Sequence, residues 1–235
     1  MKKHLMKALS CATLTTSLFL AAPAVAQDKD NDSTKRLAEA GKAFTEIMAA
    51  EDKAIPGSVL DKAQCVAIIP GMKKGGFIVG GSFGRGAVSC RTADKKSWGA
   101  PAMLEMGGGS VGLQLGASST DVVMLILNRE GMDSLLKDKF TLGGDASVAA
   151  GPVGRAATAE TDALMKAKIL SYSRSSGVFG GVALKGSTLK QDNDANKQLY
   201  GKAMDATEIL SGKVTPPAGA ASMNQALAKY SPVGK

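Results

Sequence analysis

The chain has 235 residues, which is enough for one sizeable hydrophobic core, and it carries 29 Lys and Arg against 21 Asp and Glu. The net charge of +8 suits contact with an anionic surface. Aromatic residues make up only 4% of the chain and are not interleaved with the cations, so nucleic acid is not expected as a partner.

Residues 1–26 have the layout of a secretory signal peptide: a charged start, an apolar stretch and the small-residue site AVA, ending at Ala26. Cleavage there would remove three lysines and the only histidine, His4, leaving 26 basic residues against 21 acids, an excess of +5. The mature chain would then have no imidazole for general-base or metal chemistry. Lipoprotein processing at Cys11 is disfavoured, because almost no apolar segment precedes it. We therefore expect export to the periplasm.

A helical pattern opens the expected domain, which covers residues 33–212. After a polar, flexible lead over residues 27–32, Ser33 or Thr34 is expected to cap a helix. One stripe of this helix, at helical spacing, consists of Leu37, Ala40, Phe44, Ile47 and Met48. Ile55–Pro56 ends the pattern, and a short helix is expected over residues 57–64.

Two further helices are predicted in the second half of the chain. One is short and covers Arg129–Asp138. The other begins at Asn193 or Asp194 and runs through Leu210, with Gly212 as its stop. The remaining residues, 213–235, are expected to be a tail.

Between these helices, apolar and small residues alternate with a period of two, which predicts strands. The expected strands lie within Cys65–Pro70 and residues 77–90, 100–106, 110–118, 120–128 and 139–161, and a hairpin is expected around Ser175–Gly177. Glycine recurs in them and permits bends and close backbone approach. The prediction is a single α+β domain: a curved, mainly antiparallel, glycine-rich β-sheet or partial barrel with flanking N- and C-terminal helices.

Cys65 and Cys90 are the two cysteines that would remain after removal of the leader. An even pair in an exported chain favours a disulfide between them. Two buried free thiols are the alternative.

Motifs for nucleotides and metals are incomplete. Gly107, Gly109 and Gly112 match G-x-G-x-x-G, but an alternating segment follows them where a phosphate-binding helix is needed. Asp28, Asp30, Asp32 and Glu39 have calcium-loop spacing, but Ser33 stands where that loop needs glycine. We expect no cofactor and no metal.

Catalytic patterns are also weak. Ser134 with Lys137, and Ser187 with Lys190, form S-x-x-K, which is common by chance and here lacks companion motifs. Glu160 and Asp162 are close enough in sequence to act as paired acids, but Thr161–Asp162 also reads as a helix start. No catalytic residue is predicted, and a histidine-free hydrolase is kept as an alternative.

Cations embedded among apolar and glycine residues are the remaining candidates for a binding site. The segment KKGGFIVGGSFGRGAVSCR holds Lys73, Lys74, Arg85 and Arg91, and a second set consists of Arg155, Lys168 and Arg174. Grouped on one face, they would receive the phosphate of a lipid headgroup. Taken alone, the residues favour separate, solvated or ion-paired side chains.

Several segments together resemble the SYLF domain family, from about Ser33 to Leu210. They are VLDKAQCVAIIPGMKKGGFIVGGSFGRGAVSCR, WGAPAML, TDVVMLILN, SLLKDKFTLGGDASVAAGPVGR and ILSYSRSSGVFGGVALKGS. The resemblance implies lipid binding, because eukaryotic members bind phosphoinositides and, in some cases, actin. It also implies the stand-alone form of exported bacterial members, which have no assigned enzyme activity. The family's amphipathic helix matches Lys35–Met48, and its basic glycine-rich segment matches Lys73–Arg91.

The function we expect from the sequence is therefore non-enzymatic binding of anionic phospholipid or a membrane surface. The apolar stripe of Leu37, Phe44, Ile47 and Met48 would enter the interface or cover a groove, beside cations near Lys73, Lys74, Arg85 and Arg91. The alternative is a structural or protein-interaction domain, whose protein partners are unknown, in which the same stripe packs on the sheet. Burial of Phe44 and Ile47 favours that alternative.

Overall fold

The computed structural model describes residues 32–50, 54–76, 79–94, 97–111, 118–154, 166–175, 177–182 and 184–231. The expected leader and residues 27–31 lie outside this part of the chain, as does Arg155. The helices are α1 (Asp32–Met48), α2 (Gly57–Leu60), α3 (Arg129–Leu135), α5 (Asn193–Tyr200), α6 (Ala206–Ile209), the 3₁₀ helix η1 (Ala218–Ala220) and α7 (Ala221–Tyr230). No helix in the described residues is both long enough and apolar enough to cross a membrane.

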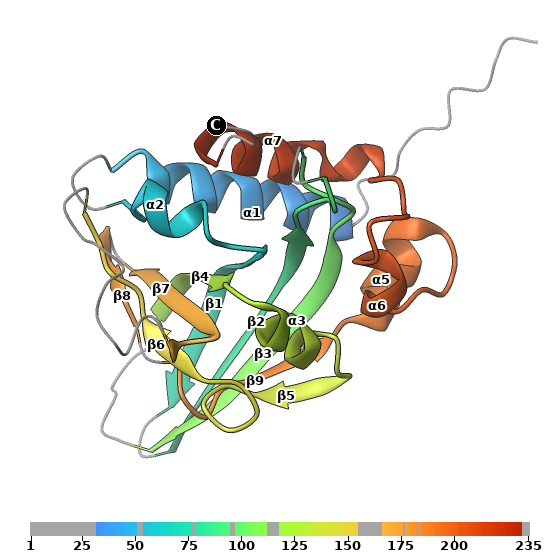
Figure 1. The fold of residues 1–235 in the computed structure, drawn as a ribbon. Coiled ribbons are helices and arrows are strands. Elements are labelled where there is room, and N and C mark those ends of the chain that lie inside the picture. The colour runs from blue at the N-terminus through green and yellow to red at the C-terminus, as the bar shows by residue number, and fades with distance from the viewer. Residues whose placement is uncertain are drawn as a thin grey trace, which may run out of the picture.

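One sheet organises the molecule. Its strands are β1 (Cys65–Gly76), β2 (Val79–Cys90), β3 (Ala102–Val111), β4 (Ser118–Ile126), β5 (Lys139–Thr141), β6 (Val148–Ala150), β7 (Ile169–Ser175), β8 (Val178–Gly181) and β9 (Thr188–Gln191). The order is β5-β9-β3-β2-β1-β4-β7-β6, with β8 also paired to β7. Among the strand pairs in the described residues, only β6–β7 is parallel. The sheet curls into a partial barrel (Figure 1), so that its two edge strands, β5 and β6, are linked by residues 142–147 alone. The predicted α+β class is confirmed.

The sheet has a different core on each face, as the period of two predicted. Val66, Ile68, Ala87 and Met103 pack beneath α1 and α7 on what we call the outer face. The residues between them, including Ala67, Ile69, Val88 and Leu104, line the concave inner face with residues of α3 and α6. The central strands are thus buried on both faces, and the helices α1 and α7 cover the outer one.

Strand β1 continues past the proline at which the sequence predicted a stop. Its pairing shifts register between Ile68 and Lys73, a bulge in which Gly71 has φ of +56°. Gly86 on β2 lies against this bulge, and a Cβ there would come within 1.9 Å of the carbonyl oxygen of Ile68. Glycine at 86 is thus required for β2 to pack against the bulge. Beyond the bulge, β1 continues to pair with β2 as far as Lys73 and the residues after it.

The C-terminal region differs from the prediction in two places. The expected helix 193–210 is interrupted after Tyr200, where Gly201 adopts φ of +72° as a left-handed cap and Asp205 caps the separate helix α6. The expected tail 213–235 instead contains η1 and α7, and Met223 and Leu227 of α7 are fully buried. Helix α7 lies so close to α1 that a Cβ at Gly41 would be 2.8 Å from the carbonyl oxygen of Ser222.

Cys65 and Cys90 are directly opposite each other on β1 and β2 and form the predicted disulfide. Both are buried in the inner-face core. The bond therefore closes the β1–β2 hairpin at the end far from Lys73.

Removing this disulfide is expected to lower the free energy of unfolding by about 3 kcal/mol, because the unfolded chain loses a closed loop with a sequence separation of 25. Urea unfolding of the oxidised protein and of the Cys65→Ser, Cys90→Ser variant, both read by circular dichroism, measures the difference. Equal unfolding free energies would contradict the expectation. Reductant added to the folded protein should act slowly, since both sulfur atoms are buried.

Candidate anion-binding face

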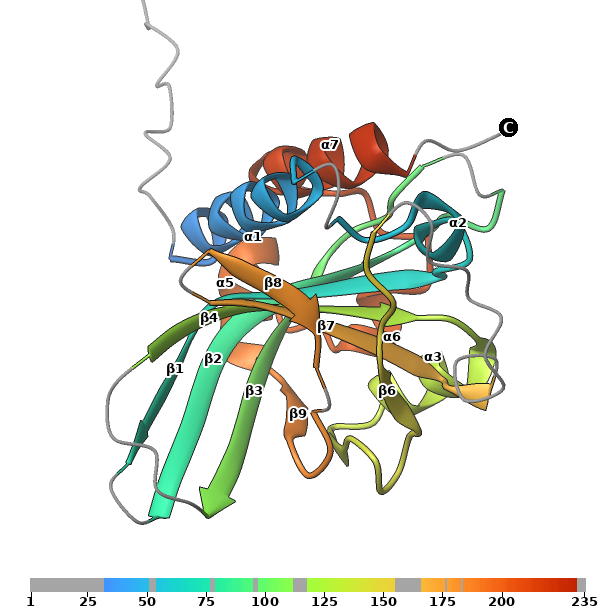
Figure 2. The ribbon, with the colours of Figure 1, turned by 90° about the vertical axis from the view of Figure 1, so that its left-hand side faces the viewer.

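The far ends of β1, β2 and β3 reach beyond the helices that cover the sheet (Figure 2). On the outer face, cross-strand pairing places residues there in two rows. The near row is Lys139, Lys190, Glu105 and Arg85, and the far row is Thr141, Thr188, Gly107, Phe83, Lys73 and Ser119. Arg85 and Phe83 lie two and four residues from Ala87, which packs under α1, so both rows belong to the outer face. We call these two rows the distal face.

Phe83 is the apolar centre of the distal face. Its ring is 50% exposed, although a phenyl group of this size is usually buried. Lys73 is directly opposite it on β1, and the Arg85 guanidinium carbon is 5.6 Å from the ring centroid. Its partner on the other side, Gly107, has no side chain to cover the ring. An exposed aromatic ring between two cations is suited to a surface that is apolar beneath an anionic layer.

The two predicted lysines separate onto different faces. Lys73 pairs with Phe83 on the outer face and is exposed, with Nζ 3.5 Å from Ser119 Oγ. Lys74 pairs with Ser82 and is half-buried, and its side chain points to the inner face. Among the predicted cations that lie in the described residues, the structure brings only Lys73 and Arg85 together around Phe83.

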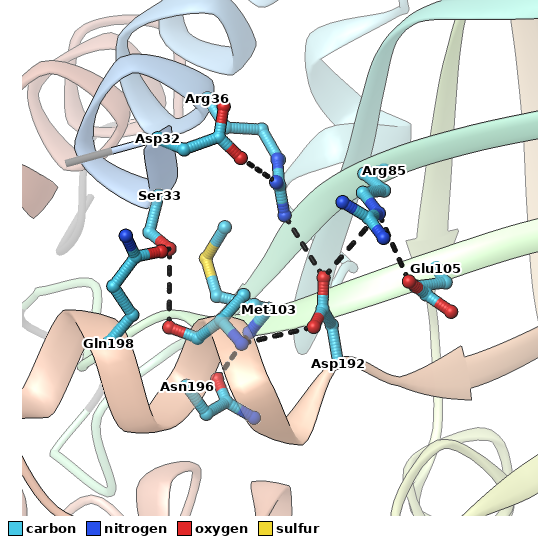
Figure 3. A network of polar contacts seen from close by, with 10 residues as sticks. Asp32, Ser33, Arg36, Arg85, Met103, Glu105, Asp192, Asn196 and Gln198 are labelled. Carbon is cyan, nitrogen blue, oxygen red and sulfur yellow. Dashed lines mark hydrogen bonds and ion pairs between the residues drawn. The ribbon is translucent and has the colours of Figure 1, made fainter.

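Arg85 also connects the distal face to a polar network at the start of α1 (Figure 3). Its Nε donates to Glu105 at 3.0 Å and is 3.9 Å from Asp192. Asp192 accepts from Arg36 of α1 at 3.1 Å and caps α5 by accepting from the Ala195 N–H at 3.0 Å. Arg36 is only 7% exposed, so Asp192 compensates a buried positive charge. The same carboxylate contacts α1, α5 and Arg85 of the sheet.

A second ion-paired contact anchors the other end of α1. Arg174 of β7 pairs with Glu46 of α1 and, at 2.7 Å, with Asp121 of β4. Asp121 also accepts the N–H of Gly71 in the bulge at 2.8 Å. Burial alone would lower the pKa of Arg174, but the bonds to Asp121 and Glu46 outweigh it and raise that pKa. Arg174 is therefore a structural cation, already occupied by two carboxylates.

The other predicted cations lie elsewhere. Arg91 is at the disulfide end of β2, with its guanidinium 4.6 Å from the Trp98 ring centroid and its Nε donating to Ala63 at 3.0 Å. Burial lowers its pKa, and Asp61 partly opposes that effect. Lys168 pairs with Glu130 at 2.9 Å. Neither joins the distal face.

The apolar stripe of α1 is in the core. Leu37, Phe44 and Ile47 are 0% exposed, and Met48 is half-buried against the same cluster. Phe44 meets the Tyr230 ring of α7 edge-on, with centroids 6.1 Å apart. The prediction that this stripe faces a membrane is wrong for the folded state, because the stripe supplies the contacts that hold α1 on the sheet.

The described residues contain no group of three or more His, Cys, Asp or Glu side chains placed to hold a metal ion. Ser134 is buried, and its hydroxyl donates to the Glu130 carbonyl at 2.9 Å, as in an ordinary helix. Glu160 and Asp162 lie outside the described residues. The absence of catalysis stays a prediction.

The aromatic residue and two of the cations of the distal face were not predicted as binding residues from the sequence: Phe83, Lys139 and Lys190. Phe83 carried a signal, since it stands in a glycine-rich alternating strand where Gly81, two residues before it on the same face, has no side chain to cover the ring. Lys139 and Lys190 carried none, because they reach the distal face only through the pairing of β5 with β9 and of β9 with β3.

Comparison with known proteins places the chain in a class of domains. The family model of Ysc84, described as "Las17-binding protein actin regulator", matches residues 107–230. The chain belongs to this family, and the predicted SYLF domain is confirmed.

Named relatives share this domain within longer chains. LAS seventeen-binding protein 3 of Saccharomyces cerevisiae is 37% identical over 169 residues, which are 71% of this chain and 36% of that protein. Protein YSC84 of the same yeast is 37% identical over 171 residues, again 71% and 36%. SH3 domain-containing YSC84-like protein 1 of Homo sapiens is 33% identical over 199 residues, 83% of this chain and 58% of that protein. The chain thus spans between about a third and three fifths of these relatives.

Asp192→Ala is expected to lower the free energy of unfolding by about 3 kcal/mol, because the buried Arg36 then keeps only the exposed Asp32 as an ion-pair partner and α5 loses its cap. Asp205→Ala is the matched control. It removes the equivalent cap from α6, where Asp205 accepts the Glu208 N–H at 2.7 Å, but it takes no ion-pair partner from a buried arginine. Its expected cost is about 1 kcal/mol. Urea unfolding compares the two, and equal losses would show that Asp192 acts only as a cap.

Proposed function

We propose that this SYLF domain binds anionic membrane surfaces without catalysis, and that the distal face makes the contact. The observation that carries the proposal is Phe83, half exposed between Lys73 and Arg85 on a part of the sheet that no described helix covers. We retain export to the periplasm as part of the proposal, so that the surface concerned is one of the cell envelope.

The expected affinity is modest. A cation beside an anionic leaflet contributes about 1 kcal/mol at low salt, and the distal face presents Lys73, Lys139 and Lys190, with Arg85 partly neutralised by Glu105. Insertion of the exposed half of Phe83 adds on the order of 1 kcal/mol. Several such terms on one rigid face give reversible binding that weakens as salt rises.

Liposome flotation tests the proposal. The protein should float with vesicles of phosphatidylcholine containing phosphatidylglycerol and remain below with phosphatidylcholine alone. Lys73→Glu and Phe83→Ser should each reduce the bound fraction severalfold, because one reverses a charge and the other removes the inserted ring. Lys62→Glu makes the same charge change at an exposed residue just before the start of β1, away from the distal face, and this variant should bind the vesicles normally. Equal recovery of all variants, or no binding to either vesicle, contradicts the proposal.

A protein-interaction domain is the second candidate. It is favoured by the burial of Phe44 and Ile47 and by a relative whose name states that it binds Las17. The two candidates differ in what the distal face meets, and the vesicle experiment separates them, since a purely protein-binding face has no reason to distinguish anionic from neutral lipid.

Hydrogen exchange separates two ways of binding a membrane. If the distal face docks, amides of β2 near Phe83 gain protection when anionic vesicles are added, while those of α1 keep theirs because its apolar stripe stays in the core. If α1 leaves the sheet to insert its stripe, the amides of α7 and of Arg36's neighbours lose protection instead. The second pattern would overturn the assignment to the distal face.

A further inference from the structure

We propose that Lys139 and Lys190 form a binding site for a phosphate-bearing ligand at the β5–β9 end of the distal face. The two lysines are directly opposite each other in antiparallel register, and both are exposed. One pair further along the same strands, Thr141 and Thr188 are also opposite each other on that face. Two lysines and two threonines therefore project from one face over a short stretch of two strands.

The charge arrangement is unfavourable without a ligand. Like charges directly opposite on paired strands destabilise a sheet. Glu105, the acid in register with Lys190, is bound to Arg85 at 3.0 Å. Neither lysine forms an ion pair with another residue that the structure describes.

Other acids near this pair are directed elsewhere. Asp192 serves Arg36 and the cap of α5. Asp145 accepts the backbone N–H of Thr141 at 2.7 Å. Asp138 is exposed and directly precedes Lys139, outside the strand. A dianionic phosphate would neutralise the opposed ammonium groups and accept hydrogen bonds from the hydroxyls, which fits a phosphomonoester better than a singly charged group.

This inference rests on the proposed function only for the source of the phosphate, which is either a lipid headgroup or a free phosphate. Lys139 and Lys190 lie in the same cross-strand row as Glu105 and Arg85. A membrane seated on Phe83 would thus place headgroups over this pair, whereas a free phosphate needs no membrane.

The test uses Lys139→Gln with Lys190→Gln in the full chain, with Lys62→Gln as the control for charge. Inorganic phosphate is titrated at constant ionic strength, and binding is followed by thermal unfolding and by amide shifts of β5 and β9. In chloride buffer the double variant should unfold at the same temperature as the wild type or slightly higher, because a repulsion is removed. Its affinity for phosphate should fall at least about tenfold.

Lys139→Glu gives an independent check, since it replaces the repulsion by an attraction to Lys190. It should raise the unfolding temperature and abolish the response to phosphate. An unchanged phosphate response in either variant contradicts the proposed site. So does a lower unfolding temperature of both variants in phosphate-free buffer, because the lysines would then stabilise the fold rather than bind a ligand.

Vesicles distinguish the two sources. Phosphatidic acid carries a phosphomonoester, and phosphatidylglycerol carries a diester. If the site takes a headgroup, the double variant loses its preference for phosphatidic acid over phosphatidylglycerol. If it takes free phosphate, that preference is unchanged while phosphate binding is lost. Both results support the site. Failure of the proposed membrane function appears differently, as absence of vesicle binding with an intact phosphate response.

Discussion

The packing of α1 on the outer face of the sheet is the contact on which the rest of the structure depends. Leu37, Phe44 and Ile47 are fully buried between the sheet and α7, and each such side chain contributes roughly 1.5–3 kcal/mol that exposure would forfeit. A stripe that supplies this much of the core is costly to release to a membrane. The burial of α1 therefore moves any surface contact onto the part of the sheet that α1 does not cover.

Charged contacts at the two ends of α1 fix where that uncovered part begins. Arg36 bonds to Asp192 near the N-terminus of the helix, and Glu46 pairs with Arg174 near its C-terminus. Both contacts continue into the sheet, through Arg85 on one side and through Asp121 to Gly71 on the other. Since Gly71 lies in the bulge that precedes Lys73, the same interactions that seat the helix also direct the strands of the distal face.

Local patterns were sufficient for much of the fold. Alternation identified β2, the even cysteine pair identified the disulfide, and helical spacing identified α1 with its apolar stripe. What failed was the choice between burial and exposure for that stripe, because an apolar stripe has the same spacing whether it meets a sheet or a lipid. Helix α7 was missed as well. Its close packing on α1 depends on Gly41, because a Cβ there would be 2.8 Å from the carbonyl oxygen of Ser222, and this long-range contact leaves no local pattern in the sequence.

The distal face shows more clearly what could not be predicted from the sequence. Lys73 and Lys74 are neighbours in sequence, yet strand geometry sends them to opposite faces. Lys139 and Lys190 are far apart in sequence, yet strand order makes them opposite partners. Which cations act together is therefore a property of register, and register depends on a bulge and on a non-sequential strand order that no short motif encodes.

A face built in this way has consequences for how tightly it can bind. Its cations sit on strands rather than on a loop, so little ordering entropy is lost on contact. Each nevertheless remains in water and is screened by salt, which limits its individual contribution. Under the proposed function, affinity comes from matching several charges at once to a flat anionic surface, and the spacing of the charges rather than their total then decides what is recognised. An opposed lysine pair that repels itself in the free protein adds selectivity to such a face, since only a ligand carrying more than one negative charge relieves both lysines together.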